Sequence, residues 1–217
     1  MRKFLKKQNG FTYIEAIIAI AIFLIITVAF YTVLATARSA WFNADTSIEL
    51  QQGLRLTLEK ISRELHESGF DKDGVWQVTI GDGTGVNGTD ILKFSMPVIC
   101  HGGDSGIDNN GDVAHWGAPL TWGCSSSTCM DADNDCATVD YKYVQYAINN
   151  DNQLIRAVLN NVNTVIGEDL VAQNISDFQL TNSADRNVVT LQVTAQRKSP
   201  ENRIITIPES TDVYLRN

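Results

Sequence analysis

Charged side chains are almost missing from one long stretch near the start of the sequence. Between Phe11 and Leu34, Glu15 is the only residue that is charged at neutral pH. A run of about 20 apolar residues is long enough to cross a bilayer as a helix. The residues before the run include four basic ones: Arg2, Lys3, Lys6 and Lys7. Such a cluster is expected to stay on the cytoplasmic side, so the rest of the chain would lie across the inner membrane.

The apolar run differs from an ordinary secretory signal, which is shorter and is cut after its apolar core at small residues. Here the residues from Leu34 to Arg38 continue into helix-forming sequence. The one small, flexible residue suited to cleavage, Gly10, stands before the core. A cut at this place would remove the basic leader and leave the apolar helix on the mature chain.

The residues around that cut, Gly10-Phe-Thr-Tyr-Ile-Glu15, resemble the prepilin leader of type IV pilins and type II secretion pseudopilins. Family members carry Gly-Phe-Thr-Leu-Ile-Glu, so Tyr13 stands here in place of Leu. The resemblance implies cleavage by a prepilin peptidase between Gly10 and Phe11 and N-methylation of Phe11. It also implies a structural subunit that assembles with other major and minor pilins or pseudopilins, and no enzyme.

Glu15 is the unusual residue of the apolar run. A carboxylate in hydrocarbon costs roughly 2.5–3.5 kcal/mol on insertion scales, so such a group usually has a partner. Cleavage after Gly10 would create a positive amine on Phe11, one helical turn away. That amine could neutralise Glu15 within the chain, or Glu15 could reach the amine of a neighbouring subunit, which is the assembly role that the resemblance implies. The plainer alternative is a carboxylate that only stabilises a helix N-terminus.

An excess of basic residues is also missing. The formal net charge is −8, and removing four of the 17 basic residues with the leader leaves 13 against 25 acidic ones, or −12. Nucleic acid as a partner calls for a basic patch, so it is not expected. After the leader and the membrane helix, about 150 residues remain, enough for one domain with a real core.

The sequence contains no C-x-x-C pair. Its four cysteines are Cys100, Cys124, Cys129 and Cys136. In an oxidising compartment they predict two disulfides, with three pairings left open. A zinc site is the rival, but its usual ligand spacings are absent.

Proline is absent between Ala35 and Ser68, and apolar residues recur there at steps of four and three: Leu50, Leu54, Leu58, Ile61 and Leu65. This stripe predicts an amphipathic second half of the helix, residues 36–68, after a transmembrane half, residues 11–35. Glu59 with Arg63, and Lys60 with Glu64, form i,i+4 pairs. Gly69 is expected to be the C-terminal cap.

After residue 69 the period of the pattern changes to two, which predicts a β-rich periplasmic or extracellular head over residues 69–217. The expected strands are Trp76–Ile80, Ile91–Met96, Tyr141–Ile148, Leu154–Leu159, Phe178–Thr181, Val189–Gln196 and Ile204–Pro208. Asn149–Asn152 is typical of a hairpin turn. The expected fold class is α+β, a long helix packed on a mostly antiparallel sheet.

Four stretches in the last part of the head carry a second, narrower resemblance. They are Leu154–Val158, Val171–Phe178, Val188–Gln196 and Val213–Asn217. They resemble minor pilins of the PilW type, and pseudopilin J of type II secretion is similar. The resemblance implies a low-copy subunit at or near a pilus tip that helps to initiate assembly. Residues 98–140 have no counterpart in it and are interpreted as a surface insertion.

The insertion contains two acidic stretches with oxygens at alternate positions: Asp108, Asn110, Asp112, and Asp131, Asp133, Asp135. Calcium loops have such spacing, but neither stretch has the glycine and glutamate of an EF-hand. A solvated acidic loop is the preferred interpretation, and no cofactor is expected. A membrane-anchored protein that binds calcium or another ligand and does not polymerise remains one alternative to a pilin. An exported enzyme tethered by an uncleaved signal anchor is another.

Two short motifs suggest enzymes and are set aside. Gly83, Gly85 and Gly88 have the spacing of a dinucleotide-binding loop, but the residues that follow predict a strand and not a helix. Gly103-Asp-Ser105-Gly106 resembles the nucleophile stretch of trypsin-like proteases, which also need a histidine and an aspartate elsewhere in a double barrel. His101 and His115 lie in the same insertion, and the chain is too short for that fold.

Overall fold

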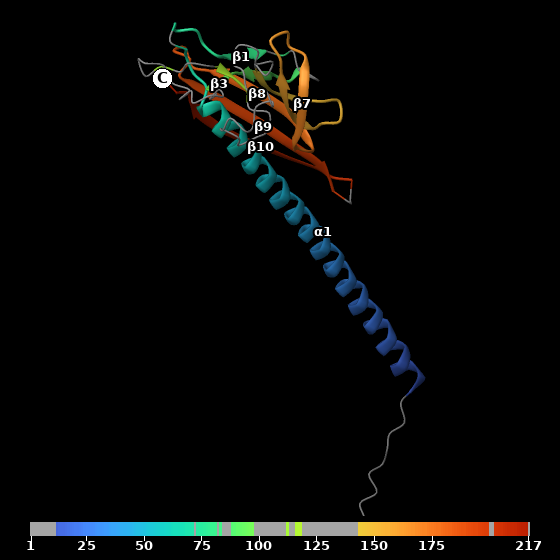
Figure 1. Ribbon diagram of the computed structural model, residues 1–217. Coiled ribbons are helices and arrows are strands. Elements are labelled where there is room, and N and C mark those ends of the chain that lie inside the picture. The colour runs from blue at the N-terminus through green and yellow to red at the C-terminus, as the bar shows by residue number, and fades with distance from the viewer. Residues whose placement is uncertain are drawn as a thin grey trace, which may run out of the picture. The chain divides into compact units, whose positions relative to one another are not determined.

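The computed structural model describes residues 12–71, 73–81, 83, 88–97, 112, 116–118, 143–199 and 202–216. The chain divides into two units, Met1–Asp45 and Thr46–Asn217 (Figure 1). One helix, α1 (Tyr13–His66), runs through both. The strands are β1 (Val78–Gly81), β2 (Ile91–Phe94), β3 (Met96–Pro97), β4 (Trp116–Gly117), β5 (Tyr143–Ile148), β6 (Leu154–Leu159), β7 (Val165–Ala172), β8 (Ile175–Asn182), β9 (Val188–Lys198) and β10 (Ile204–Tyr214).

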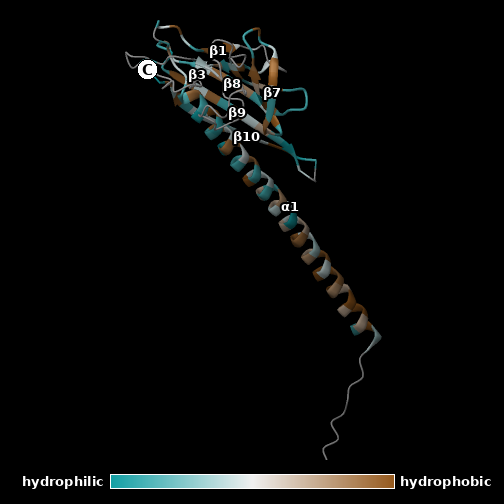
Figure 2. Cartoon of the chain, in the orientation of Figure 1, coloured by the Kyte–Doolittle hydropathy of each residue, from teal (hydrophilic) through white to brown (hydrophobic). Residues whose placement is uncertain are grey.

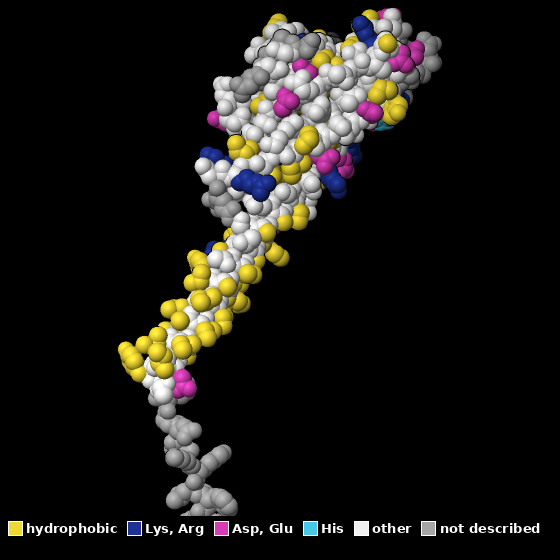
Figure 3. All heavy atoms as spheres, turned by 180° about the vertical axis from the view of Figure 1, so that it is seen from behind, with side chains coloured by type: hydrophobic (Ala, Val, Ile, Leu, Met, Phe, Trp, Pro, Cys, Tyr) yellow, Lys and Arg dark blue, Asp and Glu magenta, His cyan; other side chains and the backbone are white. Residues whose placement is uncertain are grey.

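In the first unit, the described residues are Thr12 and the start of α1, and none of them is buried. Hydrophobic residues follow one another along this part of the helix (Figure 2), and many of their side chains are exposed on the face that Figure 3 shows. It is long and apolar enough to cross a membrane. Three threonine hydroxyls are satisfied within the helix: Thr27 donates to the Phe23 carbonyl at 2.8 Å, Thr32 to the Ala29 carbonyl at 2.8 Å, and Thr36 to the Thr32 carbonyl at 2.9 Å. Internal satisfaction of polar groups is what hydrocarbon demands of a spanning segment.

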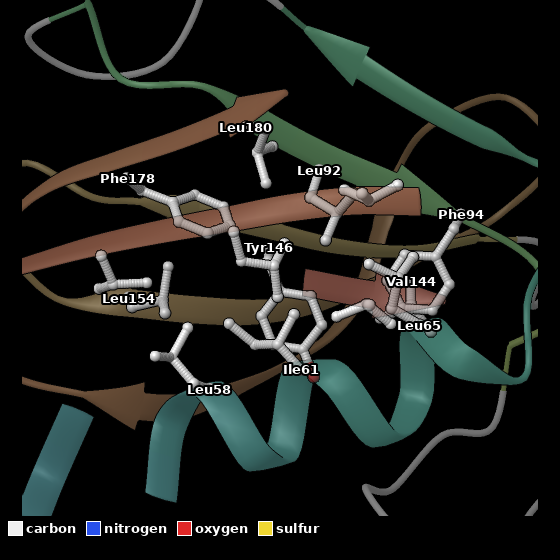
Figure 4. Close-up of a cluster of buried hydrophobic side chains, with 14 of the residues drawn as sticks. Leu58, Ile61, Leu65, Leu92, Phe94, Val144, Tyr146, Leu154, Phe178 and Leu180 are labelled. Atoms are coloured by element: carbon white, nitrogen blue, oxygen red, sulfur yellow. The ribbon is translucent and has the colours of Figure 1, made fainter. Parts of the chain in front are cut away.

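In the second unit, the predicted stripe of α1 is buried, and this confirms the amphipathic pattern. Leu58, Ile61 and Leu65 face the side chains of β5, β6 and β8 (Figure 4). Leu50 and Leu54 continue the same buried row. The stripe therefore forms one wall of the hydrophobic core, and the strands form the other.

The strands are paired antiparallel throughout the described sheets. A five-stranded sheet has the order β1-β2-β5-β6-β7, a three-stranded sheet the order β10-β9-β8, and β3 pairs with β4. Buried Asp90 joins the two larger sheets: its backbone N–H donates to the Phe178 carbonyl at 2.8 Å, and its Oδ2 accepts from the Leu180 N–H at 2.7 Å. The predicted α+β class, a helix packed on antiparallel sheets, is confirmed.

The predicted turn at Asn149–Asn152 joins β5 to β6, as expected. Asn149 Oδ1 accepts from the backbone N–H groups of Asp151 and Gln153, both at 3.0 Å. Asn152 adopts φ of 56°, a left-handed conformation that asparagine tolerates better than most residues. The glycine motif is followed by strand β2 and not by a helix, as expected.

Several strand boundaries were wrong. The segment expected as one strand over Ile91–Met96 contains β2, an interruption at Ser95, and β3. Strand β10 continues past Pro208 to Tyr214, which is possible because β10 is an edge strand and can lack one N–H in its ladder. Strand β7 was not expected at all. It is largely exposed on both faces, so its sequence shows no period of two.

The expected cap at Gly69 was wrong as well. Helix α1 ends at His66, and the Ser68 N–H donates to the Leu65 carbonyl at 2.9 Å, a tighter last turn. Gly69 does not adopt a positive φ. It pairs in parallel with Arg216, and a Cβ at Gly69 would fall on the Arg216 carbonyl oxygen. Glycine is needed here for the close approach of two backbones.

Candidate functional site at the start of helix α1

Thr12 and Glu15 form a reciprocal pair at the first turn of α1. Glu15 Oε2 accepts from the Thr12 backbone N–H at 2.9 Å and from the Thr12 hydroxyl at 2.8 Å. The Thr12 hydroxyl oxygen in turn accepts from the Glu15 backbone N–H at 3.4 Å. This is a capping box, which satisfies backbone donors that have no partner inside the helix.

The bonds that the Glu15 carboxylate accepts from described residues all end on Oε2. Its second oxygen, Oε1, therefore has room for a donor from outside the described chain. A negative charge at the first turn is also favoured by the helix dipole. The cap accounts for one oxygen of Glu15 and leaves the other able to meet a cation.

The surroundings of this carboxylate are apolar. The exposed side chains next to it are Tyr13, Ile14, Ile17 and Ile18. An anion on such a surface, once it is removed from water, calls for a positive partner. The site is thus suited to bind a compact cation such as an amine.

The same segment is where the chain matches a known family model. The model describes a prokaryotic N-terminal methylation motif and matches residues 5–31. The chain carries a pilin-type methylation motif. This motif indicates a type IV pilin-like or pseudopilin precursor, with processing by prepilin peptidase and assembly with other pilins. It points to a structural protein. No curated protein and no solved structure matches the chain.

A second polar cluster lies in the second unit of this pilin-like chain, where α1 meets β5 and β6. Arg156 Nε donates to both oxygens of Glu64 at 3.0 Å, and the Tyr146 hydroxyl donates to Glu64 Oε2 at 2.7 Å. Glu64 is 3% and Arg156 1% exposed. Burial, and then the adjacent Glu64 carboxylate, raise the pKa of Tyr146 well above its ordinary value. These groups satisfy one another inside the core, so the cluster fastens the helix to the sheet.

The sequence alone did not reveal this cluster, since Glu64 was assigned an i,i+4 pair with Lys60. A signal was present, however. Glu64 stands within the apolar stripe between Ile61 and Leu65, and Arg156 interrupts an apolar strand. Two opposite charges, each inside an apolar element, indicate a buried ion pair.

Most of the other predicted site residues lie outside the described residues. They are Gly10, Phe11, the four cysteines Cys100, Cys124, Cys129 and Cys136, the residues Asp108, Asn110, Asp131, Asp133 and Asp135, and the histidines His101 and His115. Asp112 is described, and within the described ranges no three His, Cys, Asp or Glu side chains are grouped to hold a metal. His66 is exposed, and its Nδ1 lies 2.5 Å from the Tyr214 carbonyl oxygen.

Proposed function

We propose that this chain is a minor type IV pilin, a single-pass inner-membrane precursor that a prepilin peptidase cuts between Gly10 and Phe11. After N-methylation of Phe11, the subunit helps to initiate or cap a pilus, at or near its tip. The observation that carries the proposal is the Glu15 carboxylate, capped on one oxygen and placed on a membrane-length helix with no buried residue before Thr46. Such a helix needs lipid or other subunits around it.

Each residue of the site has a distinct task in this proposal. Phe11 supplies the positive amine that cleavage creates, and Glu15 receives the amine of a neighbouring subunit through Oε1. Thr12 holds Oε2, so the carboxylate is oriented before the neighbour arrives. A charge-assisted bond in apolar surroundings is stronger than one in water, which makes this contact suited to set the register between subunits.

A minor pseudopilin of the J type is a second candidate. The four stretches that resemble both families fall in β6, in β7 and β8, in β9, and at the end of β10. Strands β8, β9 and β10 form one sheet, so most of the resembling stretches lie together in the fold. A membrane-anchored protein that binds calcium or another ligand without polymerising is the third candidate.

Mass spectrometry of the N-terminus tests processing first. The expected mature chain begins at Phe11 and carries one additional methyl group. A chain that keeps Met1 would contradict the proposal, because the amine on Phe11 would then not exist.

Two variants separate an assembly role for Glu15 from simple helix capping. Glu15→Ala removes the charge and both bonds that Oε2 accepts, whereas Thr12→Ala removes the bonds of the Thr12 hydroxyl and keeps the charge. Incorporation into sheared filaments is measured at equal levels of membrane-bound, processed subunit. We expect Glu15→Ala to enter filaments at background level and Thr12→Ala to enter them at a clearly higher level. Equal defects would support capping alone, and normal entry of Glu15→Ala would support a protein that does not polymerise.

A further inference from the structure

An exposed cluster of one cation and two aromatic rings follows the apolar run of α1. Arg38 is the first charged residue after Glu15. Its guanidinium carbon lies 5.5 Å from the centroid of the Phe42 ring. Trp41 stands three residues after Arg38, on the same side of the helix, and is 75% exposed. We call Arg38, Trp41 and Phe42 the Arg38 cluster.

The chemistry of the Arg38 cluster fits the boundary between hydrocarbon and lipid headgroups. An indole has an apolar ring and one N–H donor, and tryptophan is enriched at this boundary for that reason. A guanidinium binds phosphate oxygens while its stem stays in apolar surroundings. The cluster is also continuous with the membrane-length apolar part of α1.

We infer that the Arg38 cluster is an anchor that binds the phospholipid headgroup region of the leaflet opposite the basic leader. The inference rests on the membrane insertion of α1 in the proposed function, but it does not depend on polymerisation. The cluster therefore fixes how deeply the precursor sits in the bilayer.

The anchor also determines the depth of Glu15. Trp41 follows Glu15 by 26 residues, which is about 39 Å along a helix. A tilt of about 20° reduces this to roughly 37 Å across the membrane. The hydrocarbon is about 30 Å thick, and the bilayer with its headgroups about 40–45 Å. With Trp41 among the headgroups of one leaflet, Glu15 lies at the headgroups of the other, close to the basic leader and outside the hydrocarbon.

Fluorescence quenching by brominated lipids tests both depths on the full-length chain in phospholipid vesicles. Bromine atoms are placed either near the headgroup or near the chain ends. The emission of Trp41 is the difference between the parent and Trp41→Phe, which leaves the tryptophans of the second unit in place. Two further variants, each combined with Trp41→Phe, report depth in the bilayer at other points of the helix. Ile14→Trp reports the depth next to Glu15, and Ile26→Trp reports the depth at the middle of the apolar run.

We expect the Trp41 component and the Ile14→Trp component to be quenched mainly by shallow bromines, and the Ile26→Trp component mainly by deep ones. A Trp41 component that neither lipid quenches would overturn the anchor. Deep quenching of Ile14→Trp would overturn the depth given for Glu15. Absence of deep quenching in Ile26→Trp would contradict membrane insertion itself, and with it the proposed function.

Discussion

The two units use the same helix in opposite ways. Up to Asp45, α1 has no buried residue although most of its side chains are apolar, whereas from Leu50 to Leu65 it buries even a charged one, Glu64. The apolar side chains of the first unit are therefore suited to contacts that the described residues do not supply. In the second unit, the apolar side chains of the helix pack in the chain's own hydrophobic core. Burial, more than composition, separates the anchoring part of the helix from the folding part.

The largest effect is expected at the buried ion pair of the second unit. Arg156→Ala would leave the charge of Glu64 in the core without its cation, and removing one partner of a buried ion pair typically costs 3–5 kcal/mol. The free energy of unfolding, measured by urea titration in detergent, should fall by about that amount. The triple variant Glu64→Met, Arg156→Met, Tyr146→Phe should recover most of the loss. A loss below about 1 kcal/mol in Arg156→Ala would show that the pair is solvated.

A matched pair of isoleucines tests the comparison directly. Ile61 is fully buried and Ile25 is exposed. Ile61→Ala should reduce the free energy of unfolding of the second unit by about 2–5 kcal/mol, because it leaves a cavity in the core. Ile25→Ala should leave that free energy unchanged. If both substitutions lower the free energy of unfolding equally, the helix does not have one part that packs in the core and another that does not.

Alkaline pH should weaken the second unit through Tyr146. Its pKa is raised in the folded state above the ordinary value of 10.0, so the unfolded chain loses this proton first. Stability from this group is complete below about pH 10 and is lost as pH rises toward the folded pKa. Urea midpoints measured at increasing pH should fall less steeply in Tyr146→Phe than in the parent. If the urea midpoints of the parent and of Tyr146→Phe fall equally with pH, the loss of stability at alkaline pH comes from other groups.

Two glycines give the smallest effects, with opposite signs. Gly69→Ala would press a methyl group on the Arg216 backbone and should destabilise by about 1–3 kcal/mol. At Gly53, inside α1, an added Cβ meets nothing within 4 Å. Gly53→Ala should therefore stabilise by roughly 0.5–1 kcal/mol, since alanine loses less chain entropy in a helix. Thermal unfolding of the two variants side by side measures both signs.

Sequence reasoning succeeded where a pattern had one physical cause. The stripe from Leu50 to Leu65 and the alternation of β9 arise from burial on one face, so periodicity found them. Strand β7 was not predicted because it is exposed on both faces. The end of β10 was not predicted because a proline such as Pro208 usually marks the end of a strand. Contacts distant in sequence, such as Glu64 with Arg156, needed the fold. The capping box of Thr12 and Glu15 is local and was foreseen only as the plainer alternative for Glu15.

The contacts between the end of α1 and the last residues of the chain bear on how the protein folds during synthesis. His66 contacts the Tyr214 carbonyl across 148 positions of sequence, and the Arg216 N–H donates to the Ser68 carbonyl at 3.0 Å. A ribosome releases the helix well before the strand that closes over it. Strands β5, β6 and β8, which cover the apolar row, precede these last contacts in the sequence. In the proposed inner-membrane precursor, the second unit can therefore complete its fold only after nearly all of the chain has crossed the membrane.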